Sequence, residues 1–399
     1  MSRYKLFDNK RILIWGFGRE GQSTKHFLSR DCEPSLVDVF EGKREDINED
    51  DYDYIIKSPG IVMEDDNPKY TSQTQIFLEC FKDKVIGITG TKGKSTTSSM
   101  MYHVLNKCSG KKAILLGNIG EPCLDYFDEI DEDTIIVFEM SCHQLAHTDV
   151  SPHVAVFLNL YEEHLDYYKT IDKYFTAKSH ITTYQGRDDF FFEGDNVPYI
   201  DTVAKTDVVD SKAEYNYNLS IFGKHNNYNA EFVYRIANEV YGIDGEKIKE
   251  ALSSFTGLAH RLQLVGNFDG IDYFDDSIST IPTAAIGALN SIENAQTILI
   301  GGMDRGINYD ILIDFINNHS EYKYIMSYDS GKRIYDEVSN LDYCYYIAEL
   351  KDAVKLAKEI TSKGKACILS PASASYGFFK NFEQRGEMFK EYVISLHNS

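Results

Sequence analysis

The sequence predicts an α/β protein with parallel sheets, divided into three domains. At 399 residues, the chain is too long for one ordinary hydrophobic core, and this length favours two or three domains. Short, continuously apolar runs such as Ile12–Trp15 and Val85–Ile88 alternate with helix-like stretches. This alternation is typical of strands that are buried on both faces of a parallel sheet.

Changes in the pattern divide the chain into residues 1–83, 84–256 and 257–399. The expected strands are 12–15, 35–39, 53–56, 85–88, 113–116, 135–138, 154–159, a stretch around 262–274, 297–300, 322–326 and 367–369. The expected helices are 22–29, 94–106, 225–241, 246–255, 309–317, 350–361 and 379–396. We therefore expect domain boundaries near residues 84 and 257.

The composition excludes several classes of protein. The formal net charge of −21 argues against a chain that holds nucleic acid by general attraction to phosphates. Seven scattered cysteines without a CxxC pair suit free thiols in a reducing cytosol rather than a disulfide framework or a zinc site. The first ten residues are polar, and no apolar stretch approaches the roughly 20 residues that a membrane span needs. We expect a soluble cytoplasmic protein with neither nucleic-acid binding nor membrane insertion.

The first glycine-rich turn is Gly16-Phe17-Gly18-Arg19-Glu20-Gly21, which lies between an expected strand and an expected helix. Asp38 lies near the spacing at which dinucleotide-binding turns have an acidic residue. Glycines permit close backbone approach, and a helix N-terminus favours a phosphate. Taken alone, the pattern would suggest an NAD-dependent oxidoreductase. A simple tight turn is the alternative, and the identity of any nucleotide stays open at this point.

The second glycine-rich turn, Thr89-Gly90-Thr91-Lys92-Gly93-Lys94-Ser95-Thr96, follows a strand and opens a helix. Backbone N–H groups in such a loop form a nest for phosphate oxygens. Lys94 can reach the terminal phosphates of ATP, and Ser95 can ligate magnesium. Ile88 stands where the usual template has its first glycine, but the strand–loop–helix context compensates. The loop therefore predicts ATP binding.

Two further chemical groups follow strands of the same expected sheet. Glu139 ends the run 135–138, and His164 follows the run 154–159. A carboxylate at the carboxyl edge of the sheet would face the phosphate loop. Each residue alone is more often structural, but their shared position with the loop favours a common site.

These motifs, with several others in the same order, resemble the Mur ligase family over the whole chain. The motifs that carry the resemblance are the phosphate loop, Glu139–Leu145, Asn159–His164, Ser58-Pro59-Gly60, Leu116–Gly120, Gly223–Asn229, Gly257–Arg261, Leu369–Ser375 and Asn381–Gly386. The last two are the most diagnostic for the branch of the family that adds D-glutamate.

The resemblance implies a three-domain enzyme. A Rossmann-like N-terminal domain would hold UDP-N-acetylmuramoyl-L-alanine, a central P-loop ATPase-like domain would hold ATP, and a Rossmann-like C-terminal domain would hold glutamate. The implied activity is ATP-dependent ligation of D-glutamate to the UDP-sugar through an acyl phosphate, in the synthesis of peptidoglycan precursors. The turn Gly16–Gly21 would then receive a UDP diphosphate and not NAD.

The resemblance also implies three sets of binding residues. For the UDP-linked substrate it implies Gly18, Arg19, Glu20, Asp38, Ser58, Pro59, Gly60 and Asn118. For ATP it implies Thr89, Gly90, Thr91, Lys92, Gly93, Lys94, Ser95, Thr96, Asn226, Asn229, Arg261 and Asp276. For glutamate it implies Thr280, Arg305, Ser375 and Phe382.

Two Mg²⁺ sites are implied in the same way. Ser95 and Glu139 would hold one ion, and His164 and Lys178 the other. In this family the lysine is carbamylated, because a neutral amine can take up CO2 and become an anionic oxygen ligand. The implied catalytic residues are Lys94, Glu139, His164, Lys178 and Arg261, of which Arg261 would neutralise γ-phosphate charge after domain closure.

Two departures affect the expected glutamate pocket. Ile278 stands where many relatives have lysine, and Arg305 stands where some have lysine. Arginine keeps the charge and adds a bidentate fork, so an acidic substrate still fits. Ligases that add L-glutamate share much of the pattern and remain an alternative. A folate polyglutamate synthetase, an NAD-dependent oxidoreductase and a non-catalytic nucleotide switch are the other readings, but each leaves some of these motifs without a role.

Overall fold

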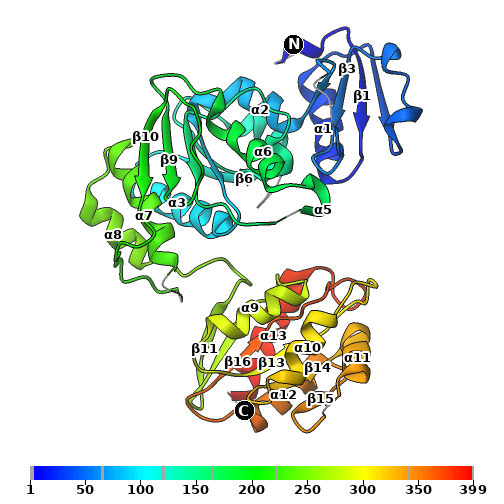
Figure 1. Cartoon of the computed structure of the whole chain (residues 1–399), viewed down its shortest axis with the longest axis vertical. Helices are drawn as coiled ribbons and strands as arrows, with labels where there is room; N and C mark the ends of the chain where they lie inside the picture. The colour runs from blue at the N-terminus through cyan, green and yellow to red at the C-terminus, as the bar shows by residue number, and fades with distance from the viewer. Residues whose placement is uncertain are drawn as a thin grey trace. The chain divides into compact units, whose positions relative to one another are not determined.

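The structure is a computed structural model that describes residues 4–63, 67–117, 122–163, 165–221, 223, 225–339 and 341–397. The chain forms two compact units, one of residues 1–219 with 225–255 and the other of residues 220–224 with 256–399. Each unit combines mainly parallel sheets with helices (Figure 1). The expected α/β fold is therefore confirmed.

The first sheet of the larger unit has the strand order β2-β1-β3-β4, and all its pairs are parallel. Its strands are β1 (Arg11–Trp15), β2 (Leu36–Phe40), β3 (Tyr54–Lys57) and β4 (Tyr70–Thr71), and its helices are α1 (Arg19–Asp31) and α2 (Gln73–Phe81). The turn Gly16–Gly18 connects β1 to α1, so the predicted strand–glycine–helix unit is present. It lies at the carboxyl end of β1, where parallel sheets bind ligands.

The second sheet has the order β10-β9-β8-β5-β7-β6 and is also parallel throughout. Its strands are β5 (Val85–Thr89), β6 (Ala113–Gly117), β7 (Ile135–Glu139), β8 (Val154–Phe157), β9 (Phe190–Gly194) and β10 (Lys205–Val209). The associated helices are α3 (Lys94–Cys108), α4 (Cys142–Leu145), α5 (Leu165–Tyr168), α6 (Ile171–Thr183), α7 (His225–Glu239) and α8 (Gly245–Ser253). The strand β5 lies inside the sheet, and the phosphate loop leaves its carboxyl end.

One apolar core joins the two sheets of this unit. It includes Ile12 and Phe27 from the N-terminal segment and Val85 and Phe138 from the central one. The rings of Phe77 on α2 and Phe138 on β7 lie edge to face with centroids 5.6 Å apart. This shared burial accounts for their grouping into one compact unit. The division at residues 84 and 257 into three functional domains stays a prediction.

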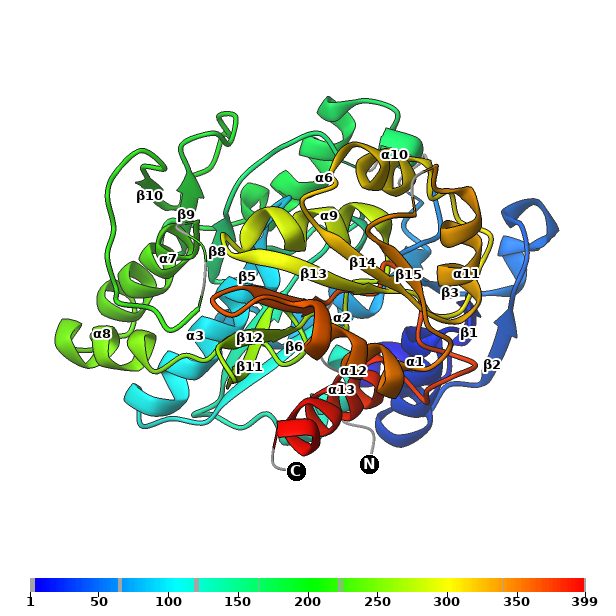
Figure 2. The same ribbon diagram turned by 90° about the horizontal axis from the view of Figure 1, so that it is seen from below.

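The smaller unit contains a sheet of order β11-β12-β16-β13-β14-β15. Its strands are β11 (Gln263–Phe268), β12 (Ile271–Asp275), β13 (Ala295–Ile300), β14 (Lys323–Met326), β15 (Cys344–Tyr346) and β16 (Ala366–Leu369). Its helices are α9 (Pro282–Ser291), α10 (Asp310–Asn318), α11 (Tyr328–Glu337), α12 (Leu350–Ile360) and α13 (Phe382–His397). Helices α9, α10 and α11 share one apolar core with the sheet, whereas α12 and α13 share another. The sheet is thus covered on both faces, and α12 and α13 run side by side (Figure 2).

The stretch expected as strand around 262–274 is a hairpin. Strands β11 and β12 pair antiparallel, and Asp269 and Gly270 at the turn have φ of 54° and 86°. An Asp-Gly pair with two positive φ values matches the twist of a two-residue hairpin. The sequence analysis also gave no helix for α2, α4, α5, α6, α9 and α11 and no strand for β4, β9, β10 and β15. Helices α4 and α5 have four residues each and β4 has two, which is too short for an apolar period to be recognised.

Candidate active site

Two glycines give the phosphate loop its path between β5 and α3. Gly90 and Gly93 have φ of 153° and 87°, values that residues with a Cβ atom rarely adopt. A Cβ added at Gly93 would lie 2.7 Å from Oδ1 of Asn229. Asn229 in turn donates from Nδ2 to Oδ1 of Asn226 at 3.2 Å. The structure thus brings Asn226 and Asn229, two residues that the resemblance implies for ATP, next to the loop.

Asn159 holds the loop from the neighbouring strand end, a role that the sequence expectations missed. Its side chain accepts from the Lys92 backbone N–H at 2.9 Å and donates to the Lys92 carbonyl at 3.0 Å. Its own carbonyl accepts from the Thr91 N–H at 2.9 Å. The side chain of Lys92 also pairs with Glu163 at 2.8 Å. Asn159 is the first residue of the motif Asn159–His164, but its contact with the Lys92 backbone appears only in the folded structure.

The side-chain nitrogens of Lys94 and Lys178 both form hydrogen bonds with the phosphate loop. Lys94 donates to the carbonyls of Gly90 and Thr91 at 2.9 and 3.0 Å, and Lys178 donates to the same Gly90 carbonyl at 2.9 Å. Lys178 is 1% exposed and lies over the ring of Tyr174, one turn earlier on α6, at 4.8 Å. Burial, with the nearby Lys94 charge, lowers the pKa of Lys178 to about 7.

Glu139 lies at the carboxyl end of β7, next to β5 in the sheet, and its side chain is buried. Burial lowers the pKa of Lys94, and Glu139 is the main charge that opposes this shift. The carboxylate of Glu139 therefore interacts electrostatically with Lys94 of the loop. Ser95, the other expected ligand of the same ion, is half-buried in the first turn of α3. His164 and Asn118 lie outside the described residues.

A pocket of about 440 Å³ opens between the two sheets of the larger unit. Both predicted binding loops contribute to it. The residues that line it are Arg19, Glu20, Pro59, Gly60, Lys94, Gly117, Pro122, Ser141, Cys142, His143, Gln144, Tyr174 and Lys178. Four predicted UDP-side residues, the predicted ATP-binding Lys94 and the predicted catalytic Lys178 therefore share one cavity.

The UDP-side wall is held in place by close packing. Gly16 has φ of 90°, and a Cβ there would lie 2.6 Å from Oγ of Ser58. Ser58 Oγ donates to the Gly16 carbonyl at 3.1 Å, so the two predicted loops are in contact. Lys57, which directly precedes Ser58, is buried and donates to the carbonyl of Ile61 at 3.2 Å. Burial lowers the pKa of Lys57 to about 8.

Glu20 connects this wall to the central part of the unit. Gln144 on α4 donates from Nε2 to Oε1 of Glu20 at 3.1 Å. Burial raises the pKa of Glu20, although this bond and the charge of Lys57 oppose the shift. Asp38, by contrast, accepts from the Tyr52 hydroxyl at 2.9 Å and does not line the pocket. Gly18 precedes α1 as its N-cap residue.

The short helix α4 contributes a wall that the sequence expectations did not assign. It begins with a capping box in which Ser141 Oγ accepts from the Gln144 N–H, and Gln144 Oε1 accepts from the Ser141 N–H. This arrangement satisfies donors at the helix start and fixes the direction of the following side chains. Cys142 and His143 line the pocket. The Ser-x-x-Gln pattern was visible in the sequence, but its position at the pocket was not.

The smaller unit contains the other predicted ATP residues. Asp276 is buried and accepts from the Leu262 N–H at 3.1 Å and from Ser370 Oγ at 2.7 Å. Burial raises the pKa of Asp276 to about 6, despite these bonds and the nearby Arg261. Arg261 is exposed. Their expected contact with ATP stays a prediction.

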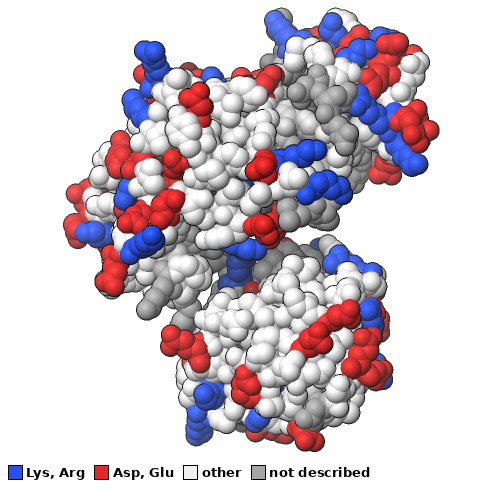
Figure 3. Space-filling view, in the orientation of Figure 1, with Lys and Arg blue, Asp and Glu red and all other residues white. Residues whose placement is uncertain are grey.

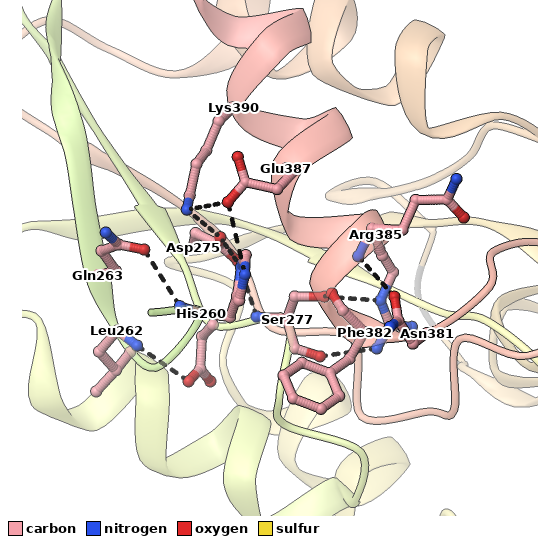
Figure 4. A network of polar contacts seen from close by, with 12 residues as sticks. His260, Leu262, Gln263, Asp275, Ser277, Asn381, Phe382, Arg385, Glu387 and Lys390 are labelled. Atoms are coloured by element: carbon pink, nitrogen blue, oxygen red, sulfur yellow. Dashed lines mark hydrogen bonds and ion pairs between the residues drawn. The ribbon is translucent and has the colours of Figure 1, made fainter. Parts of the chain in front are cut away.

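Three of the four predicted glutamate residues follow strand ends of this unit, and the fourth begins a helix. Thr280 follows β12, Arg305 follows β13, Ser375 follows β16, and Phe382 begins α13. Ser375 is buried, Thr280 and Phe382 are half-buried, and Arg305 is exposed. Figure 4 shows Phe382 beside the polar contacts that join α13 to the strand β12. Strands β12, β16 and β13 are parallel and end at the same edge of the sheet, so the segments of Thr280, Arg305 and Ser375 share that edge.

Charges of both signs are interspersed on the surface. On the face in Figure 3, Lys and Arg side chains lie among Asp and Glu side chains over both units. With a net charge of −21, long-range attraction of anions is weak. Phosphate groups must therefore be met by local donors such as the backbone of the loop Thr89–Thr96.

Comparisons with known proteins identify the family of the chain. Residues 88–210 match the Mur ligase middle domain. The UDP-N-acetylmuramoylalanine–D-glutamate ligase of Streptococcus agalactiae is 32% identical over 456 aligned positions, which cover 99% of each chain. The corresponding ligase of Lactobacillus acidophilus is 30% identical over 465 positions, again covering 99% of each chain.

Solved structures show the same fold. The MurF ligase of Thermotoga maritima in complex with ADP gives a TM-score of 0.60 at 15% identity, covering 99% of each chain. The UDP-N-acetylmuramate-alanine ligase MurC of Thermotoga maritima gives 0.59 at 18% identity, covering 97% of this chain and 100% of that one. The folylpolyglutamate synthase of Mycobacterium tuberculosis gives 0.58 at 13% identity, covering 79% and 94%. These similarities concern the fold alone and do not separate the folate ligases from the muramoyl ligases.

The glycine loop after β5, the pocket beside it and the full-length similarity define the class of protein: the chain belongs to the Mur ligase family. Within that family, the curated relatives that it matches from end to end are UDP-N-acetylmuramoylalanine–D-glutamate ligases. No helix among the described residues is long and apolar enough to cross a membrane.

Proposed function

We propose that this chain is an ATP-dependent ligase that joins D-glutamate to UDP-N-acetylmuramoyl-L-alanine in the synthesis of peptidoglycan precursors. The observation that carries the proposal is the shared pocket of the larger unit, where Arg19 and Gly60 lie in the same cavity as Lys94 and Lys178. A cavity with a UDP-side wall and an ATP-side wall suits transfer of a phosphoryl group to a UDP-linked substrate. The full-length relatives favour D-glutamate as the second substrate.

The proposed chemistry has two steps. A carboxylate oxygen of the alanine end of the UDP-sugar attacks the γ-phosphorus of ATP, forming an acyl phosphate and releasing ADP. The amine nitrogen of glutamate, after losing a proton, attacks the acyl carbon, and inorganic phosphate leaves as the amide bond forms. Free carboxylate and ammonium would only form a salt, so phosphorylation makes the carbonyl electrophilic. The protein mainly positions the groups and neutralises charge.

The loop and its lysines supply that neutralisation in our proposal. The N–H groups of residues 89–96 would bind phosphate oxygens, and Lys94 would turn from its loop carbonyls to the terminal phosphates. Mg²⁺, which neutralises phosphate charge when bound, would be held by Ser95 and Glu139. The buried carboxylate of Glu139 beside the loop fits a cation of this kind. A second ion held by His164 and carbamylated Lys178 is part of the same proposal.

We propose that Lys178 reaches the neutral state that carbamate formation requires. Only a neutral amine reacts with CO2, and burial with the Lys94 charge lowers the pKa of Lys178 to about 7. At neutral pH about half of such amines are neutral, whereas an ordinary exposed lysine is almost fully charged. Carbamylation would convert the buried cation into an anion beside Lys94, which relieves the repulsion between the two lysines. This electrostatic gain supports the carbamate proposal.

The remaining proposed binding residues are assigned within each of the two units separately. We propose that Gly18, Glu20, Asp38, Ser58 and Asn118 complete the UDP side, and that Asn226 and Asn229 lie near the adenine. Thr280, Arg305, Ser375 and Phe382 in the smaller unit would bind glutamate, with Arg305 pairing a substrate carboxylate. A cytoplasmic location, expected from the scattered free thiols, also belongs to this proposal.

The decisive experiment measures phosphate release from ATP by the full chain with UDP-N-acetylmuramoyl-L-alanine and either D- or L-glutamate. We expect release, and a new amide product by mass spectrometry, with D-glutamate. Preference for L-glutamate would support the related L-glutamate ligase instead. If neither enantiomer supports release, the ligase proposal fails. Binding of NAD in place of ATP, measured by calorimetry, would support the oxidoreductase reading of Gly16–Gly21.

A further inference from the structure

Arg385 is a buried arginine at the junction of the loops that carry the proposed glutamate residues. It lies on α13, three residues after Phe382, and its side chain is 1% exposed. Each of its nitrogens donates one hydrogen bond: Nε to Ser277 Oγ at 3.0 Å, one terminal nitrogen to the Ser277 carbonyl at 2.8 Å, and the other to the Ser373 carbonyl at 3.0 Å. Figure 4 shows its fork turned toward Ser277.

These partners belong to two different glutamate loops. Ser277 lies between Asp276 and Thr280 in the loop after β12, and Ser373 lies two residues before Ser375 in the loop after β16. Ser277 Oγ also donates to the carbonyl of Phe382 at 2.8 Å. Arg385, Ser277 and Phe382 therefore form one closed polar connection between β12 and α13.

The loop after β13 packs against the same guanidinium. A Cβ added at Gly302 would lie 2.9 Å from a terminal nitrogen of Arg385 and 2.2 Å from the carbonyl of Ala374. The N–H of Met303 donates to that carbonyl at 2.8 Å. Arg305 is two residues further along this loop. Thr280, Arg305 and Ser375 thus each lie within three residues of a residue that contacts Arg385. Phe382 lies three residues before Arg385 on the same helix.

We propose that Arg385 is the positioning residue of the glutamate pocket: it holds the loops of Thr280, Arg305 and Ser375 against the start of α13. This inference rests on the proposed ligase function. Three bonds from one planar fork fix the relative orientation of the loops as well as their distance. A carboxylate-binding site loses affinity when its parts move by a fraction of an ångström. Discrimination between the enantiomers of glutamate depends on the same alignment.

The electrostatics agree with a structural cation rather than a titrating group. Burial lowers the pKa of Arg385 to about 10, and the nearby Asp275 opposes this shift. The guanidinium therefore stays protonated at neutral pH. The facing charged groups are Asp275, which accepts from His260 Nδ1 at 2.7 Å, and Lys390, which lies 3.5 Å from Asp275.

The test compares steady-state kinetics of the full-length wild type and the substitution Arg385→Lys. Lysine keeps the positive charge but lacks the planar guanidinium group that donates the three hydrogen bonds. We expect the KM for D-glutamate to rise about tenfold, the scale of one lost bond to a charged group, and the D over L preference to narrow. The KM values for ATP and UDP-N-acetylmuramoyl-L-alanine should stay within about twofold, because losses confined to one substrate's pocket change binding of that substrate.

Two further variants separate positioning from folding. Arg235→Lys removes a guanidinium on α7 that bonds to Glu231 and Asp207 in the larger unit, and should leave the KM for glutamate unchanged. Ser277→Ala removes only one partner and should change the KM for glutamate in the same direction but less, so it keeps the idea testable if Arg385→Lys does not fold. Added guanidinium ion should partly restore the KM of Arg385→Ala.

The inference is overturned if Arg385→Lys and Ser277→Ala lower only kcat or the melting temperature and leave the KM for glutamate unchanged. Wild-type turnover is measured first with all three substrates. Its absence would overturn the ligase function and this inference together, whereas normal turnover with an unaltered KM in the variants would overturn this inference alone.

Discussion

Lys94 and Lys178 donate to the same acceptor, because the Nζ atoms of both lie 2.9 Å from the carbonyl oxygen of Gly90. Burial of Lys178, which is 1% exposed, and repulsion from the Lys94 ammonium both disfavour the protonated form of Lys178. Its pKa is lowered to about 7. This relationship links the phosphate loop to the helix α6 and leads to the first prediction.

Replacement of Lys178 by methionine should abolish most activity but stabilise the fold in CO2-free buffer. A lysine whose pKa is lowered in the folded state destabilises that state fully below the folded pKa of about 7, and the penalty fades as pH rises toward the unfolded value. The gain in melting temperature from Lys178→Met should therefore be largest at pH 6–7 and shrink by pH 9. Calorimetric scans across this range measure it. A gain that is independent of pH would contradict the lowered pKa.

The substitution Gly93→Ala should weaken ATP binding beyond its cost in stability. The new Cβ would lie 2.7 Å from Oδ1 of Asn229, so the loop or α7 must shift, and we expect the KM for ATP to rise by an order of magnitude. Gly110→Ala is the matched control, because Gly110 has φ of 70° but an open space around it. Both substitutions carry left-handed strain of about 1–2 kcal/mol. An equal KM for ATP in the two variants would contradict the role of Gly93.

Loss of the Asn159 side chain should release the phosphate loop. Asn159→Ala removes both bonds to the Lys92 backbone, each worth about 0.5–1.5 kcal/mol, and we expect roughly tenfold weaker ATP binding by calorimetry. Asn196→Ala provides the control, because Asn196 makes the same pair of bonds to the backbone of Leu160. That variant should bind ATP normally. Equal loss of affinity in both would mean that the loop does not depend on Asn159 in particular.

Two helical glycines of the smaller unit should respond oppositely to alanine. At Gly386 on α13 a Cβ would lie 2.1 Å from His260 Nδ1 and 2.6 Å from Asp275 Oδ2, and overpacking of this kind costs about 1–3 kcal/mol. At Gly287 on α9 a Cβ would meet nothing within 4 Å, so alanine should stabilise by roughly 0.5–1 kcal/mol. Denaturant unfolding measures both. Destabilisation by Gly287→Ala would contradict the open space at α9.

The parts of the site that could be predicted are those in which function follows from a local chain path. Gly90 and Gly93 permit the backbone of the phosphate loop, and the strand before them and the helix after them can be recognised from their own residues. Glu139 was found because a charged residue at the end of an apolar strand stands out. The hairpin at Asp269-Gly270 carries an equally local signal, but the apolar run on both sides concealed the turn.

The parts that could not be predicted depend on partners distant in the sequence. Asn159 contacts Lys92 across 67 residues, and Gln144 contacts Glu20 across 124 residues. No spacing rule connects such pairs, because their proximity is set by the order of the strands in the sheets. The domain limits near 84 and the assignments of His164 and Asn118 remain predictions.

The sequence by itself determined the strand–loop–helix units, the order of the motifs and the chemical types available at each strand end, because these depend on backbone conformations of a few adjacent residues. Only the tertiary structure decided how those groups affect one another. Burial and proximity lower the pKa of Lys178, and the loops after β12, β13 and β16 all contact Arg385 on α13. Electrostatic coupling and packing act through space, and the distances that set them arise only when the sheets are assembled.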